Sequence, residues 1–230
     1  MKILVAIPVY DGKLMIEVVR CLLNEQAAAQ VAGDEIIIRF LSSCSHPAMG
    51  RNQLAQDFMD SDADRLVYLD ADVTFETGSL LKIAHSPVDF VGGAYRFKMD
   101  YENYPVGFLE GGQIPMNRVG LCLVSTLPGG FLSLSRKVFE TLKAAHPERE
   151  YIHFGKKAHA YFSMPFKNGY LCGEDSNFCI EWQETGGQVW LDPELSLTHW
   201  DFNKPYPGHI GNWLKSREAM TAVSKIGGAA

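Results

Sequence analysis

The sequence has no long hydrophobic run. The apolar run near its start, residues 3–7, ends at Pro8 and is too short for the apolar region of a secretory signal peptide. No later stretch approaches the roughly 18 consecutive apolar residues that a membrane-spanning helix requires. We therefore expect a soluble, cytoplasmic protein.

The sequence also lacks an excess of positive charge and any C-x-x-C pair. It has 21 basic and 27 acidic residues, and its formal net charge is −6. No chain-wide field therefore favours nucleic acid or an anionic membrane, and extended nucleic-acid binding is not expected. The five cysteines are widely spaced, which is typical of reduced intracellular thiols rather than of a disulfide framework or a zinc site.

What the sequence does contain is an alternation of strand-like and helix-like segments. Its 230 residues, 47% of them hydrophobic, suffice for one α/β domain. We expect that single domain over residues 1–230, with a loop or lid from about residue 200. The alternation predicts βαβ units and a parallel sheet. The predicted strands are residues 2–7, 35–40, 65–69, 89–91, 120–126 and 188–191, the predicted helices are 14–22, 51–59, 137–145, 176–184 and 213–224, and 95–118 and 151–170 are interpreted as irregular.

Two aspartates follow the third predicted strand. Residues 66–72 read L-V-Y-L-D-A-D, so Asp70, Ala71 and Asp72 lie at the carboxyl end of an apolar strand, where open parallel sheets bind ligands. Residues two apart in an extended chain point the same way, so both carboxylates are predicted to face one cation. Such oxygen ligands suit Mg²⁺ or Mn²⁺, which also bind substrate phosphates. A solvated turn is the alternative interpretation.

An apolar strand ending in Asp-x-Asp, in an α/β chain that opens with Ile-Pro-Val-Tyr, resembles the GT-A fold of glycosyltransferases. The similarity is to the family 2-like nucleotide-diphospho-sugar transferases and covers roughly residues 1–200. It implies a Rossmann-like fold with a central, mostly parallel sheet flanked by helices. It also implies that Asp70 and Ala71 contact the nucleotide and that Asp70 and Asp72 bind the metal.

The resemblance implies further nucleotide contacts from two other loops. Pro8, Tyr10 and Asp11 match the turn that holds the nucleoside, with Tyr10 on the base and Asp11 on the uracil or ribose; a plain strand-ending turn is the alternative. Arg51, in Gly50-Arg51-Asn52, matches a basic helix start, and its permanently charged guanidinium suits diphosphate oxygens. Gly12 follows Asp11 where the family more commonly has Asn-Glu, so the donor base stays open.

An acidic pair follows Gly173 at the start of a predicted helix. In inverting relatives of this pattern the second carboxylate removes the proton of the acceptor hydroxyl. We accordingly predict Asp175 as the catalytic base and Glu174 as a catalytic-site residue that binds the acceptor. Helix capping by first-turn acidic residues is the alternative, and the stereochemical outcome, inversion or retention, stays open.

The remaining site residues follow the last two predicted strands. The resemblance implies that His199 is a further metal ligand, and imidazole suits Mn²⁺ better than Mg²⁺. Gly129 and Gly130 are similar to a family loop whose backbone approaches the donor sugar or the acceptor, because glycine has no Cβ. A turn before a helix is the alternative for this glycine pair.

Taken together, the resemblance implies metal-dependent transfer of a sugar from a nucleoside-diphosphate sugar, with UDP-sugars favoured, to an unidentified acceptor hydroxyl. Residues 69–74, L-D-A-D-V-T, also fit a haloacid-dehalogenase-like phosphatase with Asp70 as nucleophile. That family carries the motif on its first strand and has a paired-aspartate motif, which this sequence lacks. A non-catalytic nucleotide-sugar binder is the other alternative. A dinucleotide-binding dehydrogenase is disfavoured, because no G-x-G-x-x-G follows the first strand.

Overall fold

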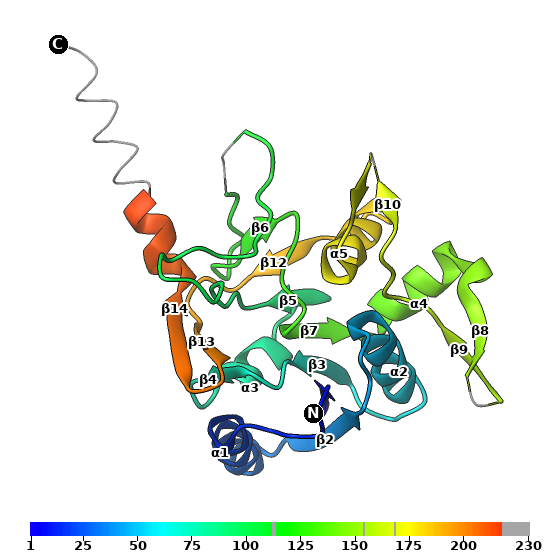
Figure 1. Cartoon of the computed structure of the whole chain (residues 1–230), viewed down its shortest axis with the longest axis horizontal. Helices are drawn as coiled ribbons and strands as arrows, with labels where there is room; N and C mark the ends of the chain where they lie inside the picture. Colours follow the sequence, from blue (N-terminus) through cyan, green and yellow to red (C-terminus); the bar gives the residue numbers. More distant parts are fainter. Residues whose placement is uncertain (112–113, 154, 168, 218–230) are drawn as a thin grey trace.

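The computed structural model describes residues 1–111, 114–153, 155–167 and 169–217. Seven strands form its central sheet (Figure 1), in the spatial order β2 (Glu35–Ser42), β1 (Lys2–Val9), β3 (Arg65–Leu69), β7 (Phe131–Ser135), β5 (Phe90–Gly92), β12 (Val189–Leu191) and β6 (Cys122–Val124). Five strands share one direction, while β7 and β6 run antiparallel to their neighbours. The predicted mostly parallel α/β sheet is thus confirmed.

Helices cover both faces of the sheet. One layer contains α2 (Pro47–Met59), α4 (Arg136–Ala145) and α5 (Glu174–Glu184), and the other contains α1 (Ile16–Ala32) and α3 (Ser79–Ala84). Successive side chains of β1 enter opposite cores: Leu4 packs in the core of α2, α4 and α5, whereas Val5 packs in the core of α1 and α3. All five residues of the central strand β3 are buried, as a strand covered on both faces requires.

A second, three-stranded sheet lies on the α1 and α3 side. Its order is β14 (Lys204–His209), β13 (Ser196–Asp201) and β4 (Val73–Phe75), and Leu197 and Phe75 contribute to the same core as α1 and α3. The expectation of a loop or lid after residue 200 is therefore wrong for its first part. β14 contains Pro205 and Pro207, which suggest a loop in the sequence but are tolerated because β14 is an edge strand.

The helix predicted at 213–224 begins earlier, at Ile210, and is described as far as residue 217. Its remaining predicted residues lie outside the described part of the chain. No helix in the described ranges is long and apolar enough to cross a membrane.

The strand β7 was not predicted. Its sequence, F-L-S-L-S, carries two serines that interrupt an apolar run. In the structure both serines have side-chain partners: Arg65 Nε donates to Ser133 Oγ at 2.8 Å, and Ser135 Oγ donates to Asp89 Oδ1 at 2.8 Å. These partners come from distant segments, so the local residue pattern alone does not predict that the two serines belong to a central strand.

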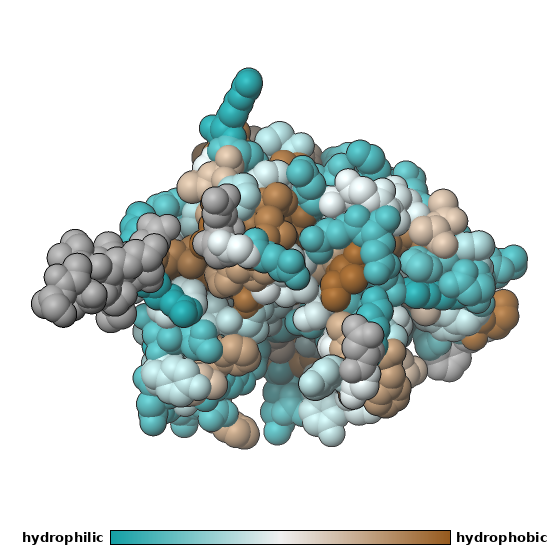
Figure 2. Space-filling model, turned by 90° about the horizontal axis from the view of Figure 1, so that it is seen from above, coloured by the Kyte–Doolittle hydropathy of each residue, from teal (hydrophilic) through white to brown (hydrophobic). Residues whose placement is uncertain are grey.

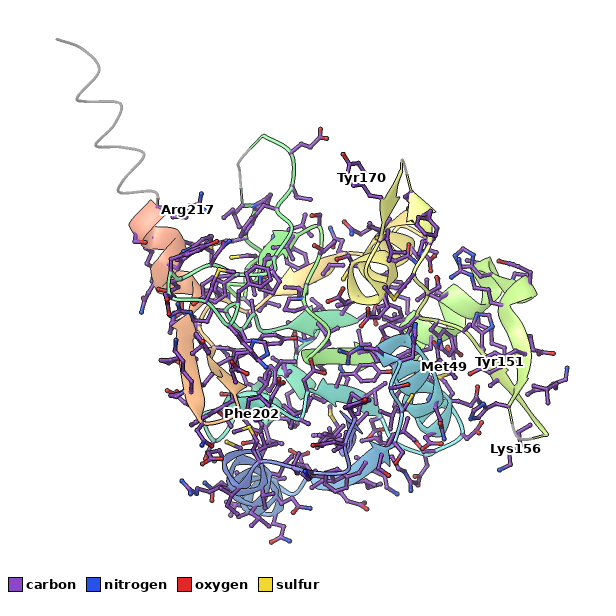
Figure 3. The ribbon with its side chains drawn as sticks, viewed as in Figure 1. Met49, Tyr151, Lys156, Tyr170, Phe202 and Arg217 are labelled. Carbon is purple, nitrogen blue, oxygen red and sulfur yellow. The ribbon has the colours of Figure 1, made fainter. Side chains whose placement is uncertain are left out.

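The prediction that residues 151–170 are irregular is wrong. They contain most of two antiparallel pairs, β8 (Glu150–His153) with β9 (Lys156–His159) and β10 (Phe166–Lys167) with β11 (Tyr170–Leu171); a 3₁₀ turn, η1 (Pro147–Arg149), precedes the first. Tyr151 and Lys156 mark the first pair and Tyr170 the tip of the second (Figure 3). Glycines with positive φ, Gly155 and Gly169, occupy the turns. The strands are too short for a clear alternating pattern.

Seen from the α5 side, the surface carries hydrophobic residues in separate patches among hydrophilic ones (Figure 2). No continuous apolar band crosses this view. This face of the molecule therefore exposes both hydrophobic and hydrophilic residues.

Candidate functional site

The predicted site residues gather at one edge of the central sheet. β3 ends at Leu69 and pairs there with Phe131, the first residue of the antiparallel β7. Asp70 and Gly130 therefore meet, and the Asp70 N–H donates to the Gly130 carbonyl at 3.0 Å. The carboxyl ends of β1 and β5 lie at this same edge, because these strands run parallel to β3. This is where an open α/β sheet binds its ligands.

Asp70 joins three segments of the chain. Its Oδ1 accepts a hydrogen bond from Arg51 Nη2 at 3.0 Å, and its Oδ2 accepts one from the Tyr95 hydroxyl at 3.1 Å. The Arg51 Nε also lies 3.7 Å from Glu174 Oε1. The structure thus brings together a predicted metal ligand, the predicted diphosphate-binding arginine and the first residue of the acidic pair.

Arg51 is a buried cation with unused donors. Its residue is 5% exposed, and among the described residues its Nε and Nη1 have no hydrogen-bond partner. Burial alone would lower the pKa of the guanidinium, but the charges of Asp70 and Glu174 outweigh it and raise the pKa above its ordinary value. Arg51 therefore remains a cation whose free N–H groups an anion would satisfy.

Asp72 lies beside His199 because β13 pairs with β4. This register sets His199 opposite Val73, directly after Asp72, and the Trp200 N–H donates to the Asp72 carbonyl at 2.9 Å. The His199 Nε2 lies 3.4 Å from Asp72 Oδ2. Lys98 Nζ contacts the same carboxylate oxygen at 2.7 Å.

The backbone fixes the tautomer of His199. Its Nδ1 lies 3.0 Å from the carbonyl oxygen of Arg96, and since a carbonyl only accepts, Nδ1 carries the hydrogen. The Nε2 atom on the other side of the ring then faces the Asp72 carboxylate. A carbonyl behind one ring nitrogen and a carboxylate beside the other is the usual arrangement of a metal-binding histidine next to a second ligand.

Burial of Asp72 tends to raise its pKa, but His199 and Lys98 together outweigh that effect and lower the pKa below its ordinary value. Burial, reinforced by the charge of Asp70, raises the pKa of Tyr95 well above its ordinary value. Asp72 is therefore an anion and Tyr95 a neutral donor at neutral pH.

The predicted extended geometry of Asp-x-Asp is wrong. Residues 70–72 form a turn, and the Val73 N–H donates to the Asp70 carbonyl at 3.2 Å. Asp70 consequently points to Arg51 and Tyr95, while Asp72 points to His199 and Lys98. Within residues 1–111, 114–153, 155–167 and 169–217, no three His, Cys, Asp or Glu side chains are grouped as a ready metal site.

Tyr95 links the two aspartates into one network. Its hydroxyl binds Asp70, and its ring packs against His199 with centroids 4.6 Å apart. Three carboxylates, of Asp70, Asp72 and Glu174, contact one guanidinium, of Arg51, and one ammonium, of Lys98. The carboxylates outnumber these two cations, and such a cluster attracts a divalent cation.

The acidic pair begins α5, after Gly173 at the N-cap. Glu174 is turned toward Arg51, whereas Asp175 Oδ1 accepts a hydrogen bond from the Ser176 N–H at 2.7 Å. The charge of Asp175 also contributes to the raised pKa of Tyr95, after burial and the charge of Asp70. Asp175 thus binds an N–H group of the first helical turn while half-buried beside the charged cluster.

Gly129 and Gly130 have a packing requirement of their own. A Cβ on Gly129 would lie 2.8 Å from the Arg51 guanidinium carbon, and a Cβ on Gly130 would overlap the Asp70 carboxylate. The pair therefore lets the backbone of β7 approach Arg51 and Asp70 closely. This contact accounts for both glycines without a bound sugar.

The remaining predicted nucleotide contacts lie at the same sheet edge. Pro8 belongs to β1 and pairs with Leu41, Tyr10 is 71% exposed just after the strand, and Asp11 Oδ1 accepts a hydrogen bond from the Lys13 N–H at 3.0 Å. Ala71 is half-buried in the turn against the core of α1 and α3. Their contacts are local, and their roles toward a nucleotide remain predictions.

Three residues of one segment, Tyr95, Arg96 and Lys98, belong to this site although the sequence pattern did not indicate them. Each contacts one predicted metal ligand: the Tyr95 hydroxyl binds Asp70, the Arg96 carbonyl binds His199, and the Lys98 ammonium binds Asp72. The available signal was their position just after β5, at the binding edge of the sheet. The segment was instead included in the irregular stretch 95–118, interpreted as a substrate-facing insertion in which no residue was singled out.

No protein-family model matches the chain, and no curated protein sequence matches it significantly. The fold is similar to solved structures. GalNAc-T7 bound to UDP, GalNAc and Mn²⁺ matches with a TM-score of 0.50 and 12% identity over 86% of this chain. This chain spans 44% of that protein.

Two further structures match with TM-scores below that of GalNAc-T7. The catalytic domain of Drosophila β1,4-galactosyltransferase 7 with xylobiose matches with a TM-score of 0.48 and 18% identity, over 91% of this chain and 70% of that chain. The inositol-1-phosphate CTP transferase of T. maritima matches with 0.42 and 12%, over 86% and 89%. At such identities the likeness concerns the fold alone, and the chain has a GT-A-like fold.

Proposed function

We propose that this protein is a metal-dependent glycosyltransferase that moves a sugar from a UDP-sugar to an acceptor hydroxyl. One observation carries the proposal: His199 Nε2 and the Asp72 carboxylate face each other at 3.4 Å, in one network with the carboxylates of Asp70 and Glu174, at the binding edge of a GT-A-like sheet. GalNAc-T7, which shares the fold, was crystallised with UDP and Mn²⁺.

Asp72 and His199 would supply an adjacent oxygen and nitrogen for Mn²⁺ or Mg²⁺. Asp70, whose oxygens accept hydrogen bonds from Arg51 and Tyr95, would have to turn toward them to add a second carboxylate. A bound divalent cation would counter the negative charge of the leaving diphosphate. The unused Nε and Nη1 donors of Arg51 are suited to phosphate oxygens, and the exposed Tyr10 to a nucleobase.

The transfer needs a base at the acceptor. The acceptor oxygen forms a bond to the anomeric carbon while the bond from that carbon to the diphosphate oxygen breaks, and the hydroxyl proton must leave. We assign that proton to Asp175, because Glu174 is already turned toward Arg51. Attack opposite the diphosphate gives inversion. The phosphatase alternative is less favoured, because both oxygens of Asp70, its nucleophile, accept hydrogen bonds.

The first test is calorimetric titration of UDP, GDP and UMP with and without Mn²⁺, using the wild-type protein and Asp72→Asn. We expect Mn²⁺-dependent UDP binding that the variant loses. Absence of nucleoside-diphosphate binding under every condition would overturn the proposal. Asp100→Asn is the matched control, since Asp100 is 95% exposed and pairs with Lys204.

Turnover separates an enzyme from a non-catalytic binder. With the donor identified, Asp175→Asn should reduce turnover by about 10²–10⁴-fold while UDP affinity stays unchanged. NMR of the product should show inverted anomeric configuration. UDP binding without transfer of any sugar would favour the non-catalytic alternative.

A further inference from the structure

Lys98 occupies the position of a cation in the proposed metal site. Its Nζ lies 2.7 Å from Asp72 Oδ2, the same oxygen that faces His199 Nε2. The ammonium thus neutralises the carboxylate at the place where a metal ion held by Asp72 and His199 would lie. A divalent cation bound to that oxygen would repel the ammonium.

The backbone around Lys98 is held, so the side chain can move alone. The Phe97 N–H donates to the Asn103 carbonyl at 2.9 Å, and the Met99 N–H donates to the Phe97 carbonyl at 2.9 Å. Arg96 Nη2 also donates to the Met99 carbonyl at 2.8 Å. The Lys98 side chain is 31% exposed, and its four-carbon stem allows the ammonium to swing to another anion nearby.

A displaced ammonium has a natural destination in this site. A metal-bound nucleoside diphosphate brings phosphate oxygens to the same cluster, and lysine binds phosphate as a point charge. Arg51 Nη2 is held by its 3.0 Å contact with Asp70, so Arg51 would offer its Nε and Nη1 to a phosphate from a fixed position. Lys98 is the cation of this network that reaches solvent, since the Arg51 side chain is only 6% exposed.

We propose that Lys98 is a built-in cation that holds Asp72 while the donor is absent and moves to a diphosphate oxygen when the metal binds. This inference rests on the proposed function. It makes Lys98 oppose binding of the metal alone and favour binding of the nucleotide with its metal. Metal and nucleoside diphosphate then bind cooperatively, and each strengthens the binding of the other.

The test compares Lys98→Met with the wild-type protein in two titrations. Binding of Mn²⁺ alone, followed by electron paramagnetic resonance of the free ion, should become about fivefold tighter in the variant. UDP binding at saturating Mn²⁺, followed by calorimetry, should become about tenfold weaker. Lys98→Arg keeps the charge and should leave Mn²⁺ affinity near the wild-type value.

Lys204→Met is the matched control. It removes the same charge from an exposed lysine, whose partner Asp100 lies two residues after Lys98. It should alter neither the Mn²⁺ affinity nor the UDP affinity. Thermal unfolding should be the same for all variants, because both lysines are at the surface. Unchanged or weaker Mn²⁺ binding in Lys98→Met would overturn the role of Lys98 alone. Failure of the wild-type protein to bind UDP with Mn²⁺ would overturn the proposed function itself.

Discussion

Two arginine–carboxylate clusters in this protein differ in how fully the arginine is hydrogen-bonded and in which partner is buried. Arg149 donates from both Nη atoms to Glu181, at 2.6 and 2.8 Å, and Asn177 donates to the same carboxylate at 2.8 Å. Arg51 makes one hydrogen bond to Asp70 and lies 3.7 Å from Glu174. The first guanidinium is paired in a bidentate way, whereas the second keeps two donors unused among the described residues.

Burial is also reversed between the clusters. The Glu181 side chain is 4% exposed and that of Arg149 is 24% exposed. At the sheet edge the Arg51 side chain is 6% exposed, while those of Asp70 and Glu174 are 22% and 15% exposed. The structural pair buries its anion, and the candidate site buries its cation beneath accessible carboxylates. Accessible carboxylates are the groups that a metal ion binds, so the comparison separates a pair that supports the fold from one that we propose binds a ligand.

The largest expected effect is on the structural pair. Arg149→Met leaves the Glu181 carboxylate buried without its cation and should lower the free energy of unfolding by about 3–5 kcal/mol. Urea denaturation followed by circular dichroism measures this. Lys157→Met, which breaks the exposed pair with Glu150, is the control and should cost less than about 1 kcal/mol. Equal losses in the two variants would contradict the distinction.

Arg51→Met tests the other cluster. Loss of its charged hydrogen bonds should weaken binding of UDP with Mn²⁺ by about 1.5–3 kcal/mol, measured by calorimetry. The free energy of unfolding should fall less than in Arg149→Met, because Asp70 and Glu174 retain solvent contact. Unchanged UDP affinity with a large stability loss would make Arg51 a structural residue like Arg149.

Gly130→Ala should disturb the site through packing. The new Cβ would overlap the Asp70 carboxylate and lie 2.7 Å from the Tyr95 hydroxyl, so Asp70 must shift. We expect a stability loss of about 1–3 kcal/mol in urea denaturation, together with weaker UDP binding. Gly50→Ala, in α2, is the control. The atoms nearest to its new Cβ would be 3.6 Å away, and alanine favours the helix over glycine by about 1 kcal/mol. A tolerated Gly130→Ala would refute the packing requirement.

The smallest expected effect is a pH dependence near the structural cluster. Burial, together with the nearby charges of Lys143 and Arg149, lowers the pKa of His159 below its ordinary value. The unfolded chain then takes up a proton more readily than the folded one. Stability from this residue is complete above about pH 6.5 and is lost as the pH falls through the lower folded pKa.

Urea denaturation at a series of pH values measures that slope. His159→Phe should flatten it, whereas His46→Gln, at an exposed position, should leave it unchanged. Arg149 and Asn177 lower the pKa of Glu181 against the effect of burial, so the contribution of Glu181 is lost only below about pH 4.5. An unchanged slope in His159→Phe would show that another group titrates in this window.

The sequence by itself determined the βαβ beginning of the fold and the position of Asp70 and Asp72 at the end of the third predicted strand. Those features are local: apolar runs of strand length, helical spacing and a sudden pair of carboxylates at a strand end. The family resemblance added Arg51, Glu174 and His199, and the structure brings all three into the network of Asp70 and Asp72. Their roles in binding and catalysis stay predictions.

Only the tertiary structure decided how these residues meet. His199 reaches Asp72 through the pairing of β13 with β4, across more than half of the chain, and no local pattern encodes that register. Tyr95, Arg96 and Lys98 became visible as site residues only through contacts with Asp70, His199 and Asp72. Periodicity reports which face of an element is buried, whereas a site depends on contacts between distant segments, which the packing of the whole chain sets.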